Sequence, residues 1–350
     1  MSTGVVTRLV IAGAAAIVLG GPLTAQTESV QPPRPGHPAD HLPANMTRLT
    51  WFGERPVWSP DGKRIAFMSK SFGDAFEIEL ATRRIRLITH FPNPGFLRVH
   101  YLPNGDYLLI GAPKFEDIEK TRFNEQEFWV LRRGSKVPQR LNQKVSEGVA
   151  MSRKSPRVAW SVDWRTNPET YAQGTSAIVV ADLVEQDGRY VIANKREVVR
   201  ESSSACRSVE PQDFRDDDGE LIWVCYHEPP VRTAAIYGVD LKTGARTTYR
   251  QVTGEYNEPE GIFPDGRHIL VESGKDQRTA VNSSKFMDIW KLKLEPQGKD
   301  FVRMTRFGEF DGFKASNPAV SPDGKTFAFQ EGHSTDASGV GYGIYLFKLK

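Results

Sequence analysis

The sequence predicts an all-β fold: a six-bladed β-propeller of four-stranded blades, closed by pairing of an N-terminal strand with the last blade. Two observations lead to this prediction. A short hairpin unit built around Pro-Asp-Gly returns along the chain at a regular spacing. The last unit stops one strand short, while a matching strand-like segment precedes the first. The composition, 39% hydrophobic and 25% charged in 350 residues, is ordinary for a globular domain.

The first residues have the pattern of a targeting signal. Arg8 supplies a positive charge, residues 9–20 form a short apolar run, and residues 21–25 end in small side chains. The run is too short to cross a bilayer, so residues 1–25 are predicted to be a secretory signal peptide, with an uncleaved N-terminal anchor as the alternative. We therefore expect a periplasmic or secreted protein with no membrane span after cleavage.

A proline-rich segment follows the signal. Residues 26–44 contain five prolines, with Gly36 among them, and are predicted to be an extended, poorly ordered linker. The propeller is predicted to occupy residues 45–350.

The repeated unit is clearest in its first and last copies, at residues 56–67 and 318–329. In its turn, proline presets φ, aspartate bonds back to the local backbone and glycine adopts the left-handed conformation, which together close a β-hairpin. More divergent copies lie at 99–108, 149–160, 216–223 and 261–270. The turn positions 62, 105, 155, 219, 266 and 324 are about 52 residues apart on average, close to the period of propeller blades.

A second hairpin completes each unit. In the fourth unit it consists of residues 235–240 and 246–249, so a blade has four strands, A to D from the axis outward. The last unit ends in its third strand, at residues 345–347. Residues 47–50 resemble the outer strands of other units and are predicted to supply the missing strand, which would leave no exposed edge.

The ten residues from Trp58 to Phe67 resemble the WD40-like PD40 repeat of TolB-type propellers, and the resemblance covers residues 45–350. It implies the fold but no single function, because such relatives include periplasmic scaffold proteins, the propeller halves of prolyl-oligopeptidase-type peptidases and oligogalacturonate-lyase-like enzymes. The chain departs from the enzymes in two ways. It has no Gly-x-Ser-x-Gly nucleophile elbow or peptidase domain, and no His/Gln cluster like that of the metal-dependent lyases.

The predicted binding surface is the face that carries the starts of strand A and the loops between strands B and C, which we call the loop face. The opposite face carries the A–B and C–D turns, and we call it the turn face. Long B–C loops suggest a built-up binding surface, with drift in tolerant surface loops as the alternative. The long loops are 112–126, 163–176, 274–287 and 332–342.

Charged residues are predicted to converge on the axis at the loop face. They are Glu54, Glu147 and Glu258 at one equivalent position of the repeat, Glu210 and Glu260 near it, and the basic Arg98 and His100. Such a funnel could bind a divalent cation or a basic ligand, and a hydrated funnel is the alternative. We expect its rim to carry His100, Trp164, Arg165, Tyr171, Arg278 and His333. Packing of Trp164 over its own blade edge is the alternative.

Other classes of ligand are not indicated. The histidines lack the spacing of a metal site, and no cofactor is predicted apart from the cation considered for the funnel. The net charge is only +3, with Lys and Arg spread along the chain, which argues against nucleic acid as a partner. Cys206 and Cys225 flank a hairpin centred near Asp216, so we expect them to form a disulfide in an exported protein.

Two main functions remain open. The first is an exported, monomeric, non-enzymatic binding or scaffold protein whose funnel takes a protein segment or a cell-envelope polymer or glycan. The second is a propeller lyase or hydrolase acting on a glycan, with Glu, His, Arg or Tyr side chains of the funnel as acid, base and charge stabiliser. A structural propeller whose funnel holds only a cation is a third.

Overall fold

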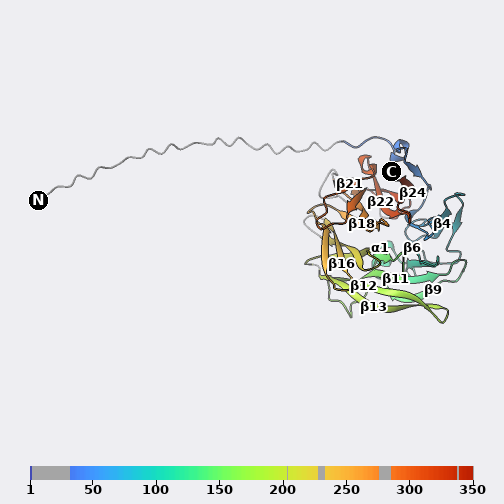
Figure 1. The fold of residues 1–350 in the computed structure, drawn as a ribbon. Helices are drawn as coiled ribbons and strands as arrows, with labels where there is room; N and C mark the ends of the chain where they lie inside the picture. The colour runs from blue at the N-terminus through green and yellow to red at the C-terminus, as the bar shows by residue number, and fades with distance from the viewer. Residues whose placement is uncertain (2–31, 203, 228–232, 276–284, 337–338, 350) are drawn as a thin grey trace. The chain divides into compact units, whose positions relative to one another are not determined.

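The computed structural model describes residues 1, 32–202, 204–227, 233–275, 285–336 and 339–349. Six four-stranded antiparallel sheets form a ring, so the prediction of a six-bladed propeller is confirmed (Figure 1). The predicted signal peptide and the start of the predicted linker lie outside the described residues, apart from Met1 and Pro32.

Each blade uses four consecutive strands of the chain, except the sixth. The strands of blades 1 to 3, from the axis outward, are β2 (Glu54–Trp58), β3 (Arg64–Met68), β4 (Ala75–Glu79) and β5 (Ile85–Leu87); β6 (Arg98–Tyr101), β7 (Tyr107–Gly111), β8 (Glu127–Leu131) and β9 (Gln139–Lys144); β10 (Val149–Met151), β11 (Arg157–Asp163), β12 (Thr175–Gln186) and β13 (Arg189–Ser202).

Blades 4 to 6 repeat this order, with the first strand of the chain at the outer edge of blade 6. Their strands are β14 (Ser208–Arg215), β15 (Glu220–His227), β16 (Thr233–Asp240) and β17 (Arg246–Arg250); β18 (Asn257–Ile262), β19 (His268–Ser273), β20 (Asp288–Lys293) and β21 (Phe301–Arg303); β22 (Phe313–Val320), β23 (Thr326–His333), β24 (Ile344–Lys348) and β1 (Met46–Arg48). The helical segments are α1 (Ile118–Asn124), η1 (Pro38–His41) and η3 (Phe307–Glu309).

The ring is closed by the N-terminal strand, as predicted. In β1, Thr47 pairs with Leu346 and Arg48 with Tyr345, antiparallel to β24. The strand is shifted slightly from the prediction, because it begins at Met46 and ends at Arg48. Figure 1 shows the blue N-terminal segment beside the red strands of blade 6.

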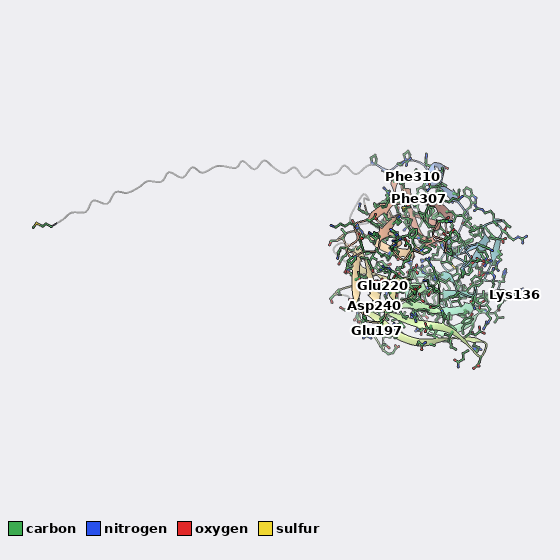
Figure 2. The ribbon with its side chains drawn as sticks, in the orientation of Figure 1. Lys136, Glu197, Glu220, Asp240, Phe307 and Phe310 are labelled. Carbon is green, nitrogen blue, oxygen red and sulfur yellow. A yellow bond between two sulfur atoms is a disulfide. The ribbon has the colours of Figure 1, made fainter. Side chains whose placement is uncertain are left out.

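Residues 33–44 differ from the extended, poorly ordered linker that their composition predicts. They belong to the same compact unit as the propeller and lie against blade 6. The His37 ring packs edge-on against Phe313 at 4.6 Å, and the His41 ring stacks on Phe310 at 5.5 Å. Figure 2 labels Phe310 at this edge of the molecule. The prolines therefore restrict the backbone conformations of this segment. Its side chains pack against apolar and aromatic partners next to blade 6.

The Pro-Asp-Gly turns have the geometry that the sequence predicts. In the first turn, the Asp61 carboxylate accepts hydrogen bonds from the Ser59 hydroxyl at 2.6 Å and from the Lys63 backbone N–H at 3.1 Å. The turn glycines adopt the left-handed conformation, with φ of 67° at Gly62, 89° at Gly105, 66° at Gly266 and 69° at Gly324.

The turn of blade 4 is built differently. Here Asp216, Asp217 and Asp218 adopt the left-handed conformation, with φ of 54°, 53° and 65°. Aspartate tolerates this region better than most side chains. The carboxylate of Asp218 also accepts hydrogen bonds from the hydroxyls of Ser152 and Ser155 in blade 3. The acidic turn therefore has a structural role between two blades.

Each blade buries both faces of its sheet. In β3, Ile65 and Phe67 pack toward blade 6, whereas the alternate residues Ala66 and Met68 pack toward blade 2. Apolar clusters of this kind join every pair of neighbouring blades in the described chain. Because side chains alternate along a strand, a strand with a continuous apolar run serves two interfaces at once.

Carboxylates between blades add specific polar contacts. Glu77 of blade 1 is 2% exposed and accepts hydrogen bonds from the blade 2 hydroxyls of Tyr101 at 2.6 Å and Tyr107 at 2.9 Å. The guanidiniums of Arg86 and Arg133 also donate to it, at 2.8 and 3.0 Å. Burial alone would raise the pKa of Glu77, but these donors outweigh it and lower the pKa to about 2.

The predicted disulfide between Cys206 and Cys225 is present, with Cα atoms 5.7 Å apart. Both cysteines are buried in the apolar cluster between blades 3 and 4. The bond ties the segment before β14 to β15, inside blade 4.

Glu77→Gln provides a test of the contact between blades 1 and 2. We expect its unfolding free energy at about pH 7 to fall by about 3 kcal/mol, because two arginines lose a buried charged partner. The folded pKa of about 2 lies below the unfolded value near 4.3, so the contribution of Glu77 is complete above about pH 5 and is lost as the pH falls toward 2. Urea unfolding of both proteins across this range measures the difference. Glu79→Gln, exposed on the same strand, is the matched control. A difference that does not change with pH would contradict this account.

Candidate functional site

The inner strands of all six blades enclose a cavity of about 370 Å³ on the propeller axis. It reaches the turn face, because four exposed turn prolines line it: Pro60, Pro103, Pro264 and Pro322. None of the described residues in the B–C loops lines it. The cavity therefore opens on the turn face, opposite to the loop face that the loop lengths favour as a binding surface.

One polar layer forms the deep end of this cavity. Arg55, Arg98, Gln212 and Asn317 each stand seven residues before the turn position of their own blade, and all four line the cavity together with Glu260 of blade 5. Equivalent positions of a propeller repeat meet at the same height on the axis, so these side chains form one ring.

Four of these side chains stand at β-bulges of the inner strands. The pairing register shifts between Glu54 and Val57, between Pro211 and Asp213, between Pro259 and Gly261, and between Ser316 and Ala319. The extra residues include Arg55, Gln212, Glu260 and Asn317, each next to a proline. A bulge redirects a side chain, and proline in a strand is confined to such irregular positions.

Two of the bulged residues adopt a conformation that is uncommon for their type. Arg55 has φ 52° and Asn317 has φ 46°. The Arg55 backbone N–H donates to the Gln330 side chain at 2.6 Å, and the Asn317 amide donates to Glu260 at 3.1 Å and to Glu272 at 3.2 Å. Left-handed residues that neighbours hold in place are concentrated at functional sites, so this layer is the candidate site.

A clamp of arginines on Glu147 lies at the loop-face end of the channel. Glu147 is 8% exposed and accepts hydrogen bonds from Arg55 at 2.9 Å and from two nitrogens of Arg122 at 2.6 Å. Arg98 is 4.0 Å from the same carboxylate. Burial would raise the pKa of Glu147, but the charges of Arg122 and Arg55 outweigh it and lower the pKa to about 2.

Arg122 reaches this clamp from helix α1, which lies in the B–C loop of blade 2. Asp117 caps the helix by accepting a hydrogen bond from the Lys120 backbone N–H at 2.7 Å. On the next residue of α1, the ring of Phe123 lies 5.3 Å from the guanidinium of Arg165 in blade 3. Helix α1 therefore ties blades 2 and 3 together beside the axis (Figure 1).

The other carboxylates of the channel have the opposite electrostatic behaviour. Burial, and then the charges of Glu147 and Glu258, raise the pKa of Glu210 well above its usual range. Burial raises the pKa of Glu260 above its usual range, and the charges of Glu258 and Glu272 raise it further. The pKa of Glu272 rises to about 8. Glu258 accepts hydrogen bonds from the hydroxyls of Tyr226, at 2.5 Å, and of Tyr256. Burial and neighbouring carboxylates thus disfavour the charged forms of Glu210, Glu260 and Glu272.

His100 lines the same cavity on β6, two residues after Arg98. Burial, and then the positive charges of Arg98 and Arg55, lower its pKa to about 3, so the imidazole is neutral at ordinary pH. Its Nε2 atom is buried and has no hydrogen-bond partner among the described residues. His100 therefore lines the cavity and carries a buried ring nitrogen without a hydrogen-bond partner among the described residues.

The described residues contain no group of three or more His, Cys, Asp or Glu side chains that could hold a metal ion. Cation binding in the funnel remains a prediction.

Most of the predicted funnel residues are brought to the axis. The electrostatic contacts above join Arg98, Glu147, Glu210, Glu258 and Glu260, and His100 lies among them. Glu54 is also buried there and accepts a hydrogen bond from Ser71 at 2.8 Å. Only Arg98, His100 and Glu260 of the predicted set line the cavity itself.

The other predicted rim residues lie elsewhere. Tyr171 is buried between blades 2 and 3 and its hydroxyl donates to Glu197 on β13, which Figure 2 labels near the edge of the ring. Trp164 packs against the same apolar cluster. Arg165 is paired with Asp163 at 2.5 Å. His333, on β23, packs against Phe313. Arg278 lies outside the described residues.

Sequence reasoning missed Arg55, Gln212, Asn317, Glu272 and Arg122. A signal for the first three was present, since Arg55-Pro56, Pro211-Gln212 and Asn317-Pro318 place proline inside inner strands. Proline there predicts a bulge. Arg122 had no such signal, because its position depends on the path of a long loop.

Comparison with known proteins identifies the fold alone. No family model matches the chain, and no curated protein matches it. Among solved structures, regucalcin from Agrobacterium tumefaciens, described as a calcium-binding protein, matches with a TM-score of 0.54 and 12% identity over 86% of this chain and 92% of that chain. TolB from Acinetobacter baumannii matches with a TM-score of 0.51 and 10% identity over 84% of this chain and 63% of that chain.

A third structure, Kuenenia stuttgartiensis hydrazine synthase, matches with a TM-score of 0.50 and 16% identity over 80% of this chain and 73% of that chain. The chain thus has a TolB-like propeller fold that proteins of different function share. No helix among the described residues is long and apolar enough to cross a membrane.

Two substitutions in the channel test its electrostatic arrangement. We expect Glu147→Gln to lower the unfolding free energy by about 3 kcal/mol at about pH 7, because Arg55 and Arg122 lose a buried counter-charge. Glu210→Gln should not lower it and should raise it, because burial and neighbouring carboxylates raise the pKa of Glu210. The charged form that Glu210 has in the unfolded chain is therefore disfavoured in the folded protein, and glutamine removes this cost. Urea unfolding of the two variants measures both values. Equal losses, or a larger loss for Glu210→Gln, would contradict the assignment.

Proposed function

We propose that this protein is a non-enzymatic binding protein that receives a segment of another protein in its axial cavity, from the turn face. The observation that carries the proposal is a cavity with apolar walls and a polar floor, in which β-bulges direct the floor side chains inward. Pre-formed cavities of about 300–1,000 Å³ with few, well-placed polar groups are typical of ligand sites.

The walls support an apolar ligand body. Val99, Val149 and Val320 line the cavity between the floor and the turns. The indole of Trp58 also lines it, and its N–H donates to the Ala319 carbonyl at 2.9 Å, which fixes the ring. The prolines at the mouth have little conformational freedom to lose on binding. A volume of about 370 Å³ suits a few side chains, so the partner would insert a short part of its chain.

The place of action that we propose is outside the cytoplasm. The predicted signal peptide at residues 1–25 supports export, and the disulfide between Cys206 and Cys225 is the kind of bond that persists in an oxidising compartment. A scaffold role would follow if the partner were part of a larger envelope assembly.

Selection of bound peptides from random heptapeptides on beads tests the proposed function. The peptides are attached so that either their N-terminus or their C-terminus is exposed. We expect the protein to enrich a family of apolar peptides. Ala319→Phe, which fills the cavity wall, should weaken their binding at least about tenfold, because the ligand loses space that its side chains occupy. Phe115→Ala, at an exposed residue of the blade 2 loop on the other face, is the matched control. Binding constants from calorimetry measure the effect.

Two results would contradict the proposed function. One is the absence of any enriched peptide. The other is a set of peptides whose binding depends on Phe115 and not on Ala319, which would place the site on the loop face.

A glycan-directed lyase or hydrolase is the second candidate, and one observation favours it. At the same cavity the pKa of His100 is lowered to about 3 and the pKa of Glu260 is raised above its usual range, and titratable groups with diverging pKa values are typical of acid–base pairs. The test is release of new reducing ends from acidic and neutral polysaccharides. Catalysis would require release that His100→Gln and Glu260→Gln each reduce at least about a hundredfold. No release by the unmodified protein excludes this candidate for those substrates.

A further inference from the structure

Arg98 is the arginine of the channel with the least complete pairing. Arg55 and Arg122 donate hydrogen bonds to Glu147 at 2.9 and 2.6 Å. Arg98 approaches the same carboxylate only to 4.0 Å, and its Nε atom is buried without a hydrogen-bond partner among the described residues. A guanidinium stays charged at any ordinary pH, so Arg98 holds a largely uncompensated charge next to the cavity.

The neighbouring carboxyl groups do not complete this pairing. Glu210 and Glu260 lie close enough to Arg98 to feel its charge, yet burial and other carboxylates keep the pKa of each well above its usual range. Burial therefore disfavours the charged form of both groups. The ionised Glu147 is shared among three arginines. Arg98 therefore favours an additional negative charge beside it.

His100 stands beside Arg98 with a second unpaired nitrogen. The two residues are first and third in β6, so their side chains lie on the same side of the strand, and both line the cavity. The buried Nε2 atom of His100 has no hydrogen-bond partner among the described residues. On the same side of β6, Arg98 and the tautomer of His100 with its proton on Nε2 can both donate to an oxygen-bearing group.

The shape of the cavity favours binding of the end of a partner peptide over binding of an internal segment. Glu147 and its arginines lie at the loop-face end of the channel, and the described residues that line the cavity belong to the inner strands and the turn-face turns. A peptide that enters through the turns meets the floor and must stop or turn back, and about 370 Å³ leaves no room for a second strand.

This inference rests on the proposed function. We propose that the bound segment is a C-terminal peptide that enters end first, with its α-carboxylate held by Arg98 and His100 at the cavity floor. The α-carboxylate supplies the single negative charge and the two acceptor oxygens that these nitrogens match. The last side chains of the peptide then lie against the apolar wall. Uronic-acid sugars carry the same anionic group, and the test below separates the two sources.

The test compares two bead libraries of identical random heptapeptides. One is attached through its N-terminus and exposes a free α-carboxylate, and the other is attached through its C-terminus. We expect enrichment only from the library with free carboxylates. Amidation of the enriched peptides should weaken binding at least about tenfold in calorimetry. Equal enrichment from both libraries, or enrichment only through free N-termini, would overturn this inference and leave the proposed function intact.

Substitution of Arg98 locates the effect. In Arg98→Gln, the preference for free acid over amide should fall to within about twofold, whereas Arg189→Gln, at an exposed residue of β13, should keep it. Arg98→Lys, which retains the charge without the planar fork, should show an intermediate preference. Thermal unfolding identifies any variant that has lost the fold. A preference that persists in folded Arg98→Gln would overturn the assignment.

The remaining outcomes are also decisive. Enrichment from neither library contradicts the proposed function itself. Binding of a uronic-acid oligosaccharide that depends on Arg98, without any peptide binding, keeps the anion site but overturns the peptide as its ligand.

Discussion

Burial of both faces of every sheet is the constraint on which this structure depends. Alternate residues of a single strand, such as Phe67 and Met68 of β3, pack against different neighbouring blades. A blade with an absent neighbour would therefore expose a complete apolar face. Pairing of β1 with β24 supplies the outer strand of blade 6 and joins the two ends of the described propeller. The ring is thus expected to fold and unfold as one cooperative unit.

Closure of the ring also determines what the axis contains. Each blade must place one inner strand there, so equivalent positions of six repeats meet in layers. Regular strands would fill these layers with alternating apolar side chains, as they do elsewhere in the blades. The bulges at Arg55, Gln212, Glu260 and Asn317 interrupt that pattern and bring polar side chains to one level. The positive φ values of Arg55 and Asn317 are local costs that the surrounding hydrogen bonds offset.

Charge is distributed unevenly along the channel. Three arginines surround Glu147 near the loop face, while carboxyl groups of blades 4 and 5 raise one another's pKa. The pKa of Glu147 is lowered and the pKa values of Glu210 and Glu260 are raised, although all three groups are buried. The difference arises from the neighbours of each carboxyl group: arginine and α1 in one case, other glutamates in the other. Arg98 approaches Glu147 only to 4.0 Å and has a buried Nε atom without a partner among the described residues, and this is why we propose an anion site at its level of the channel.

The sequence predicted the fold well because its signals are local. The hairpin turns, the strand periodicity and the unfinished last blade each follow from short segments, and the disulfide follows from the geometry of one hairpin. The site was predicted in part: repeat alignment brought Arg98, His100 and Glu260 to the axis. The predicted binding surface on the loop face stays a prediction, whereas the axial cavity opens on the turn face, because loop length says nothing about which end of a channel is filled. Glu147 could not be recognised as a clamped residue, since Arg122 comes from a helix inside a loop. Tyr171 was expected at the rim, but its ring packs in an apolar cluster and its hydroxyl donates a hydrogen bond to Glu197.

The most direct measurement is a crystal structure of the protein with a peptide that it binds. The account predicts that the peptide enters between the turn-face prolines, with its last residue at the cavity floor and a carboxylate oxygen within about 3 Å of the Arg98 guanidinium. A peptide bound across the loop face, with the axial cavity unchanged, would contradict the central claim that the channel beside Arg98 is the binding site.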